Sequence, residues 1–181
     1  MLTDYVVIDL EMTGLNAKTD RILEAGAARV RGNVVTATFS EIINPKRELS
    51  EKVISLTGIT NEMAVQGKEM DATLMAFLDF IGEDILVGQN VIFDYSFLKQ
   101  WAVNHKRTFE RNAVDTLKLA RKFLPQEQKK DLASLCSYFG IERVHAHRAL
   151  DDVMETQQIF EQLQKIMRQE HQRRFDQSIA I

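Results

Sequence analysis

Two acidic residues, Asp9 and Glu11, lie at the end of an otherwise apolar run that starts at Tyr5. The run predicts a buried strand, and side chains of a strand alternate between its two faces. Both carboxylates should therefore project from one face, about 6.5–7 Å apart along the chain. Burial of two unpaired carboxylates costs several kcal/mol, so the pattern predicts a divalent cation beside them. The alternative is an ordinary edge strand whose acidic face meets water.

Length and composition favour one globular domain, because 181 residues with 45% hydrophobic content suffice for one sizeable core. The lone Cys136 cannot form an internal disulfide. The sequence shows neither a secretory leader nor a long apolar segment, so we expect a soluble cytoplasmic protein without a membrane partner. The net charge is −3, yet the second half of the chain is basic on balance. That half either meets phosphates or is simply a solvated surface.

The periodicity of apolar residues predicts strands first and then an alternation of strands and helices, which is typical of an α/β fold with a mixed sheet flanked by helices. A hairpin is expected around the turn at 31–33. The expected strands cover 5–11, 22–30, 34–43, 85–87 and 113–114, and the expected helices cover 50–56, 71–81, 91–104, 116–123, 131–139 and 148–167.

A third acid, Asp94, shares the apolar stripe of its predicted helix. Spacings of three, four and seven residues place it with Phe97, Leu98 and Trp101. A carboxylate on the apolar side of a helix is a candidate site residue. The alternative is a structural aspartate in the first turn, favoured by the helix dipole.

Asp151 and Asp152 are adjacent on the last predicted helix and must point in different directions. From Asp152, helical steps reach Ala149, Thr156, Ile159 and Leu163. From Asp151, the same steps reach Arg148, Glu155, Gln158 and Gln162. We therefore expect Asp152 to face inward and Asp151 to face outward.

Four carboxylates thus occupy inward or strand-end positions, while the chain has no cysteine cluster that would favour zinc. Oxygen ligands suit Mg²⁺ or Mn²⁺, and two such ions could activate a water and stabilise the leaving oxygen of a phosphodiester. His145 and His147 lie just before the last helix, and His147 is the candidate general base. The proposed metal ligands are Asp9, Glu11, Asp94 and Asp152.

Together, residues 7–15, 90–94 and 147–152 resemble the three motifs of the DEDD family of 3′-to-5′ exonucleases, in its histidine-containing branch. The chain resembles most the epsilon proofreading subunits of bacterial DNA polymerase III. Segments 57–60 and 114–117 are similar to parts of the family that help form the substrate groove. The resemblance implies a ribonuclease H-like fold with a five-stranded sheet, an exonuclease domain over residues 1–165 and a C-terminal tail over 166–181.

For the site, the resemblance implies two divalent ions on the four acids and His147 as the base. It also implies hydrolysis of single-stranded nucleic acid ends to nucleoside monophosphates, in proofreading or repair, with a DNA polymerase or another replication or repair protein as partner. The residues that it suggests as substrate contacts are Met12, Thr13, Leu15 and Phe97. Plain core packing is the alternative for Phe97, because of its apolar stripe.

Two alternatives to a DNA exonuclease remain open. Epsilon-like relatives commonly carry threonine where this chain has Met12, and methionine there is similar to oligoribonucleases, which digest short RNA. DNA is favoured over RNA as the substrate. A catalytically silent subunit that only holds a polymerase is the other alternative, and the presence of all five catalytic residue types argues against it.

Overall fold

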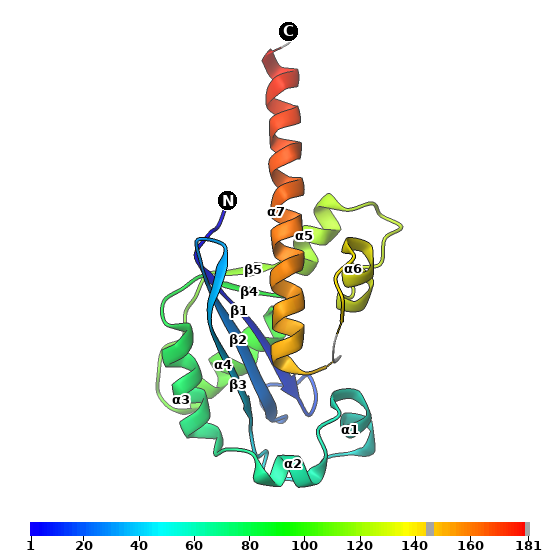
Figure 1. The fold of residues 1–181 in the computed structure, drawn as a ribbon. Helices are drawn as coiled ribbons and strands as arrows, with labels where there is room; N and C mark the ends of the chain where they lie inside the picture. Colours follow the sequence, from blue (N-terminus) through cyan, green and yellow to red (C-terminus); the bar gives the residue numbers. More distant parts are fainter. Residues whose placement is uncertain (144–146, 180–181) are drawn as a thin grey trace.

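A five-stranded mixed sheet forms the centre of the molecule (Figure 1). The computed structural model describes residues 1–143 and 147–179, the last three by their backbone alone. The strands lie in the order β3-β2-β1-β4-β5. β1 pairs antiparallel with β2 and parallel with β4. The strands are β1 (Tyr5–Met12), β2 (Ile22–Arg31), β3 (Val34–Ile42), β4 (Leu86–Gly88) and β5 (Ala113–Asp115).

Helices cover both faces of this sheet, as the sequence predicted. They are α1 (Glu51–Thr57), α2 (Asn61–Gln66), α3 (Met70–Ile81), α4 (Ile92–Asn104), α5 (Thr116–Phe123), α6 (Leu132–Phe139) and α7 (Ala149–Ile179). The prediction of a mixed five-stranded sheet between helices is therefore confirmed.

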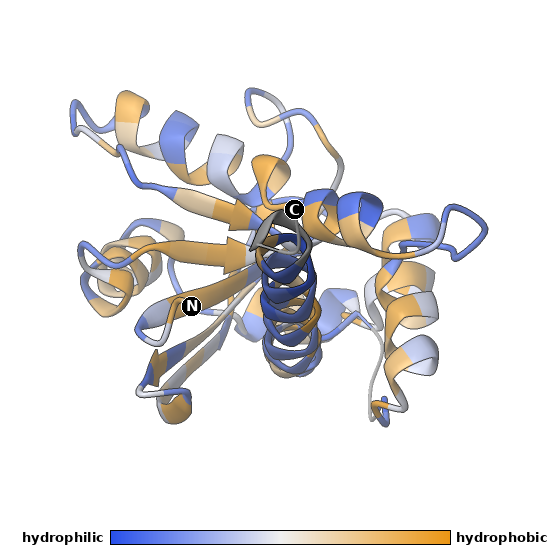
Figure 2. Cartoon of the chain, turned by 90° about the horizontal axis from the view of Figure 1, so that it is seen from above, coloured by the Kyte–Doolittle hydropathy of each residue, from blue (hydrophilic) through white to orange (hydrophobic). Residues whose placement is uncertain are grey.

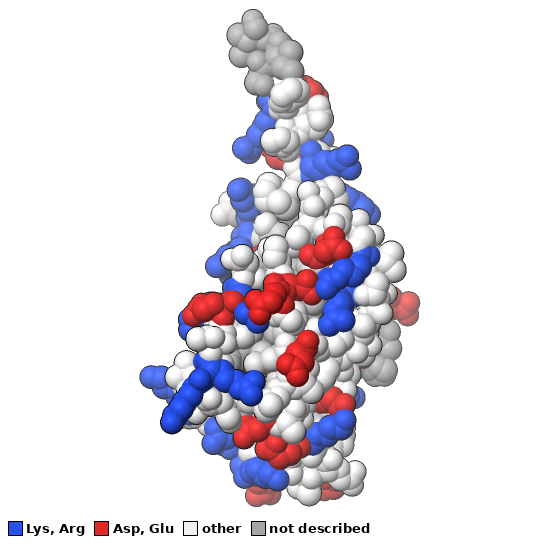
Figure 3. Space-filling view, turned by 90° about the vertical axis from the view of Figure 1, so that its left-hand side faces the viewer, with Lys and Arg blue, Asp and Glu red and all other residues white. Residues whose placement is uncertain are grey.

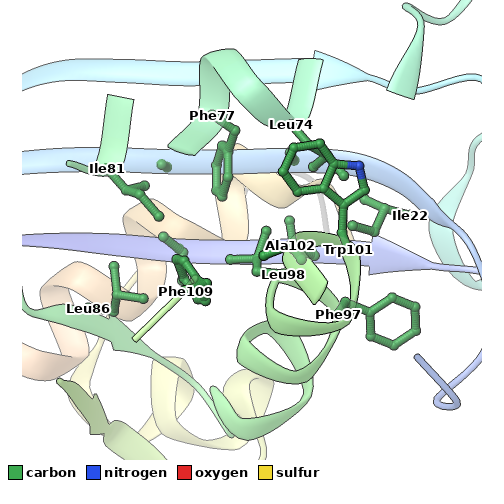
Figure 4. Packing of buried hydrophobic residues seen from close by; sticks show 14 of the residues in the cluster. Ile22, Leu74, Phe77, Ile81, Leu86, Phe97, Leu98, Trp101, Ala102 and Phe109 are labelled. Carbon is green, nitrogen blue, oxygen red and sulfur yellow. The ribbon is translucent and has the colours of Figure 1, made fainter. Parts of the chain in front are cut away.

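The alternation of side chains along β1 divides the core into two parts. Val6, Ile8 and Leu10 pack with α3 and α4, in the cluster drawn in Figure 4. Tyr5 and Val7 face α7 in a second cluster. Figure 2 shows hydrophobic residues, in orange, along the strands and on the helices that pack against them. Asp9 and Glu11 continue the α7 face of the strand, because they lie two and four residues beyond Val7.

Two elements differ from the sequence prediction. α2 was not expected, because its six residues lack an apolar stripe; Thr60 caps it with its hydroxyl. α7 runs to Ile179 instead of ending near 167, and Figure 1 shows its last turns projecting beyond the sheet. Those turns are polar, so no apolar stripe marked them in the sequence. Among the described helices, none combines the length and the apolar character needed to cross a bilayer.

Candidate active site

Asp9 and Glu11 lie near the carboxyl end of β1, on the face that α7 covers. Across the strand pair, Asp9 is opposite Gly26 and Glu11 is opposite Glu24. Glu11 is 8% exposed. The strand therefore holds its two acids under the first turns of α7, as the period of two residues required.

Asp94 reaches the same place from α4, which follows β4. Its Oδ1 accepts a hydrogen bond from the backbone N–H of Leu10, 2.8 Å away. Asp94 is buried, and so are Phe97, Leu98 and Trp101 of its stripe. The inward position that the helical spacing predicted for Asp94 is confirmed.

The beginning of α7 brings Asp152 and His147 to Glu11. Candidate ligand atoms of these three residues all lie within 4.8 Å of one another, so they form a possible metal-binding group. Asp152 is 5% exposed, which agrees with the inward direction expected for it. His147 has a φ of +59°, a left-handed conformation that non-glycine residues adopt infrequently. His145 lies outside the described residues.

Burial and mutual repulsion raise the pKa values of these acids. Burial is the largest cause for Asp9, whose pKa is well above its usual range, followed by the charges of Asp94 and Glu11. Burial also raises the pKa of Glu11 to about 8, with repulsion from Asp152 adding to it. The pKa of Asp94 rises to about 7 for the same first reason, although the Leu10 N–H opposes the shift.

This electrostatic situation fits a divalent cation. Carboxylates that resist ionisation together become compatible once a positive charge lies between them. The donors are oxygens with one imidazole close by, which suits a hard ion such as Mg²⁺ or Mn²⁺. Glu11 and Asp152, together with His147, have ligand atoms close enough to share an ion, while Asp9 and Asp94 stay predicted ligands from the sequence.

Two arginines at the site were missed by the sequence analysis. Arg143 donates to Oδ1 of Asp152 across 2.9 Å and to Oε2 of Glu155 across 2.8 Å. Arg148 binds Glu24 through two of its nitrogens, at 2.9–3.3 Å. Arg148 lies 124 residues from Glu24, and Arg143 lies nine and twelve residues before Asp152 and Glu155, so no strand or helix spacing in the sequence indicated these pairs.

Glu155 shows that the helix side shared with Asp151 is partly covered. Asp151 was expected to face outward and is half-buried, and Glu155, four residues further along the same side, is only 3% exposed. It packs where α6 meets α7, with Cys136 Sγ 3.6 Å from its Oε2 and Arg143 on the same oxygen. Helical periodicity could not show that a second helix covers this side of α7.

The four residues suggested as substrate contacts differ in their surroundings. Leu15 is 68% exposed, whereas Met12 packs partly against the core. The hydroxyl of Thr13 accepts a hydrogen bond from the backbone N–H of Arg21. Phe97 is 3% exposed, and Figure 4 shows it at the end of the core cluster nearest the tip of β1. Packing therefore accounts for Phe97, while substrate contact stays a prediction for all four.

Segment 114–117, which resembles part of the family's substrate groove, holds the turn that precedes Asp94. Oδ1 of Asp115, at the end of β5, accepts hydrogen bonds from the backbone N–H groups of Asn90 and Leu117. Asn90 has a φ of +58°, so the turn before α4 is fixed in an uncommon conformation. Gln89 bridges the backbone carbonyl of Lys130 and the hydroxyl of Thr116.

Comparison of the sequence with known proteins identifies clear relatives. The model of the family described as "Exonuclease" matches residues 6–160. The DNA polymerase III subunit epsilon of Aquifex aeolicus is 37% identical over 157 residues, which are 86% of this chain and 78% of the relative. A PolC-type DNA polymerase III of Clostridium perfringens is 34% identical over 92% of this chain. The chain spans only 12% of that relative's length.

Solved structures share the fold. Escherichia coli exonuclease I in complex with a dT13 oligonucleotide has a TM-score of 0.80 over 96% of this chain and 44% of that chain, at 18% identity. The nuclease domain of 3′hExo, a DEDDh family member bound to rAMP, has a TM-score of 0.74 over 90% and 92% of the two chains, at 19% identity. These likenesses confirm the ribonuclease H-like fold. With its family model matched over residues 6–160, the chain belongs to the exonuclease family that its three motifs resemble.

Proposed function

We propose that this protein is a divalent-metal-dependent 3′-to-5′ exonuclease that hydrolyses single-stranded DNA ends to nucleoside monophosphates, in proofreading or repair. One observation carries the proposal: β1, α4 and the start of α7 bring four acids and one histidine to a single end of the sheet. Membership of the exonuclease family supports it. So does the similarity to DNA polymerase III subunit epsilon.

In this proposal, Asp9, Glu11, Asp94 and Asp152 hold two divalent ions, Mg²⁺ or Mn²⁺. When bound, the ions supply Lewis acidity and charge neutralisation for phosphodiester hydrolysis. Asp94 also fixes α4 relative to β1, since its carboxylate accepts a hydrogen bond from the backbone of that strand.

His147 takes a proton from the attacking water onto a ring nitrogen. Histidine suits this role because its usual pKa lies near neutral pH, so the ring can accept and release a proton during turnover. Its position within 4.8 Å of Glu11 and Asp152 places it beside the acids that orient the reacting groups.

Exposed Leu15 and the neighbouring Met12 and Thr13 contact the terminal nucleotide. Their segment continues β1 beyond the two acids, so a strand end that enters the site passes over them. Phe97 is the fourth contact, at the same end of the core.

DNA is the substrate that we favour, because the relatives include a DNA polymerase III subunit epsilon and a PolC-type DNA polymerase III. A short-RNA exonuclease is the second candidate. Met12 at the site supports it, and 3′hExo, a structural neighbour, was solved with rAMP. A catalytically silent subunit is not favoured, since the site keeps every group that the reaction needs.

The test uses the purified protein with end-labelled DNA and RNA oligonucleotides of matched sequence, with Mg²⁺, with Mn²⁺ or with a chelator. We expect one-nucleotide steps from the 3′ end, faster on DNA, and none with the chelator. Faster digestion of RNA would favour the second candidate. No digestion of either substrate with either ion would contradict the enzymatic proposal.

The division into an exonuclease domain over 1–165 and a tail over 166–181 also stays a proposal. The family match ends at residue 160, and the projecting turns of α7 follow it. Figure 3 shows basic side chains along these turns, which include Arg168, Arg173 and Arg174. The tail is the place where we would seek a DNA polymerase or another replication or repair partner.

A further inference from the structure

The strongest unassigned feature beside the site is the ion pair between Glu24 of β2 and Arg148, the residue directly after His147. Three donor-acceptor contacts of 2.9–3.3 Å join the guanidinium to both carboxylate oxygens. Oε2 of Glu24 also accepts a hydrogen bond from the backbone N–H of Ala149, 3.1 Å away. One carboxylate thus binds both the side chain and the backbone at the beginning of α7.

The carboxylate of this ion pair is buried, which makes the loss of its partner costly. The side chain of Glu24 is 1% exposed, whereas that of Arg148 is 38% exposed. Leaving a buried carboxylate without its cation is strongly destabilising, so the folded state requires Arg148 to lie beside Glu24. Two parallel hydrogen bonds between a guanidinium and a carboxylate also fix the angle between the groups. The pair therefore restricts where the chain can enter α7.

The backbone of β2 allows the close approach that this pair requires. A Cβ at Gly26 would lie 2.5 Å from the carbonyl carbon of Ala149 and 2.7 Å from the nitrogen of Leu150. Gly26 is the residue opposite Asp9, and Glu24 is opposite Glu11. The start of α7 is consequently docked on the two residues of β2 that face the acids of β1.

His147 directly precedes Arg148 in the chain and has the uncommon φ of +59°. From these contacts we propose that the Glu24–Arg148 pair is a positioning device: it fixes His147 relative to Glu11 and Asp152, so that the imidazole is aligned for proton transfer. Glu24 and Arg148 are positioning residues that act through His147. This inference rests on the proposed function, and neither the family match nor the relatives' names assign a role to this pair.

The test compares four variants with the wild type. Arg148→Met removes the guanidinium, Arg148→Lys keeps the charge without the planar fork, and Glu24→Gln keeps the shape and the acceptor for Ala149. The double variant Glu24→Gln with Arg148→Met leaves no buried charge unpaired. Arg31→Met is the matched control, because Arg31 is 39% exposed and pairs with Asp84.

Two measurements are made on each variant, besides its unfolding temperature. The first is kcat and KM for single-stranded DNA. The second is the NMR signal of the His147 ring, which can be assigned among the four histidines with His147→Gln. The second readout does not depend on nuclease activity.

We expect Arg148→Met and the double variant to lower kcat by up to about 100-fold, the cost of a small misplacement of a reacting group, with KM nearly unchanged. The kcat of Arg148→Lys should lie between those of these variants and the wild type, since an ammonium cannot make the two parallel hydrogen bonds of the planar guanidinium. The His147 signal should shift in each of them and stay unchanged in Arg31→Met. The double variant should unfold at the wild-type temperature, which separates positioning from stability.

The proposal is overturned if the folded double variant keeps the wild-type kcat, or if the His147 signal stays in place. A change in KM alone would equally contradict it, because that would assign Arg148 to substrate binding. Should the wild type digest no oligonucleotide, the proposed function fails, and the His147 signal still decides whether the pair holds the ring.

Discussion

The backbone N–H of Leu10 donates to Oδ1 of Asp94 across 2.8 Å, which ties the acid of α4 to the strand that carries Asp9 and Glu11. The two residues are 84 positions apart in the sequence. Asp94 is therefore both a proposed metal ligand and a structural link. The two roles can be separated, because an amide oxygen accepts the same hydrogen bond without the charge.

Asp94→Asn should keep the fold and lose activity. The loss should be about 10²–10³-fold in kcat, the usual cost of removing one strong electrostatic contribution at a reacting centre. The unfolding temperature should stay the same or rise, since a buried carboxylate is replaced by a neutral group. Asp79→Asn, an exposed acid on α3, is the control. Near-normal digestion by Asp94→Asn would remove Asp94 from the site.

His147→Ala should lower kcat by about 10²–10⁴-fold, the range for loss of a general base, with a small effect on KM. Oligonucleotide digestion under saturating and limiting substrate gives both constants. His105→Ala serves as the control, because His105 pairs with Asp71 at the end of α4. Equal kcat in the two variants would show that His147 is not the base.

In a chelator, the protein should lose stability as the pH rises from about 5 to about 8. The pKa of Glu11 rises from 4.5 to about 8 on folding, and that of Asp94 rises from 3.8 to about 7. The folded state thus binds more protons than the unfolded state in this window, so the free energy of unfolding falls with pH. Unfolding temperatures measured across the window check the sign.

The same experiment has two internal comparisons. Glu11→Gln should flatten part of the pH dependence, because it removes one raised pKa. Mn²⁺ should stabilise the protein most at the alkaline end, where the acids are free to bind it. A pH profile that neither Glu11→Gln nor Mn²⁺ changes would contradict the idea of a cation site built from buried acids.

Arg143→Met should destabilise the protein by about 3 kcal/mol, because it leaves the buried Glu155 without its cation. Combining it with Glu155→Met should restore part of the stability, since that pair is then replaced by apolar groups of similar size, while the buried Asp152 still lacks the guanidinium. Urea unfolding measures both. Arg174→Met, which removes a pair with Glu170 on the exposed end of α7, should have no measurable effect. Equal stability of Arg143→Met and the wild type would contradict the prediction.

Local periodicity was sufficient to predict the direction of the main acids. A period of two residues placed Asp9 and Glu11 on one face, and a period of 3.6 residues distinguished Asp152 from Asp151. The same arguments failed at Glu155, because α6 covers a second side of α7 in addition to the side that packs on the sheet. The length of α7 failed for a related reason, since its last turns carry no apolar stripe.

The sequence by itself indicated the strands and most of the helices, the five candidate catalytic residues and the family, because each depends on residue types at fixed local spacings; α2 and the last turns of α7 lack such a pattern. Only the tertiary structure decided how the acids are held. Glu24 and Arg148 are 124 residues apart, and their contact exists because β2 pairs with β1 in one register and Gly26 admits the backbone of α7. Contacts of this kind arise from packing between elements, which no local pattern encodes.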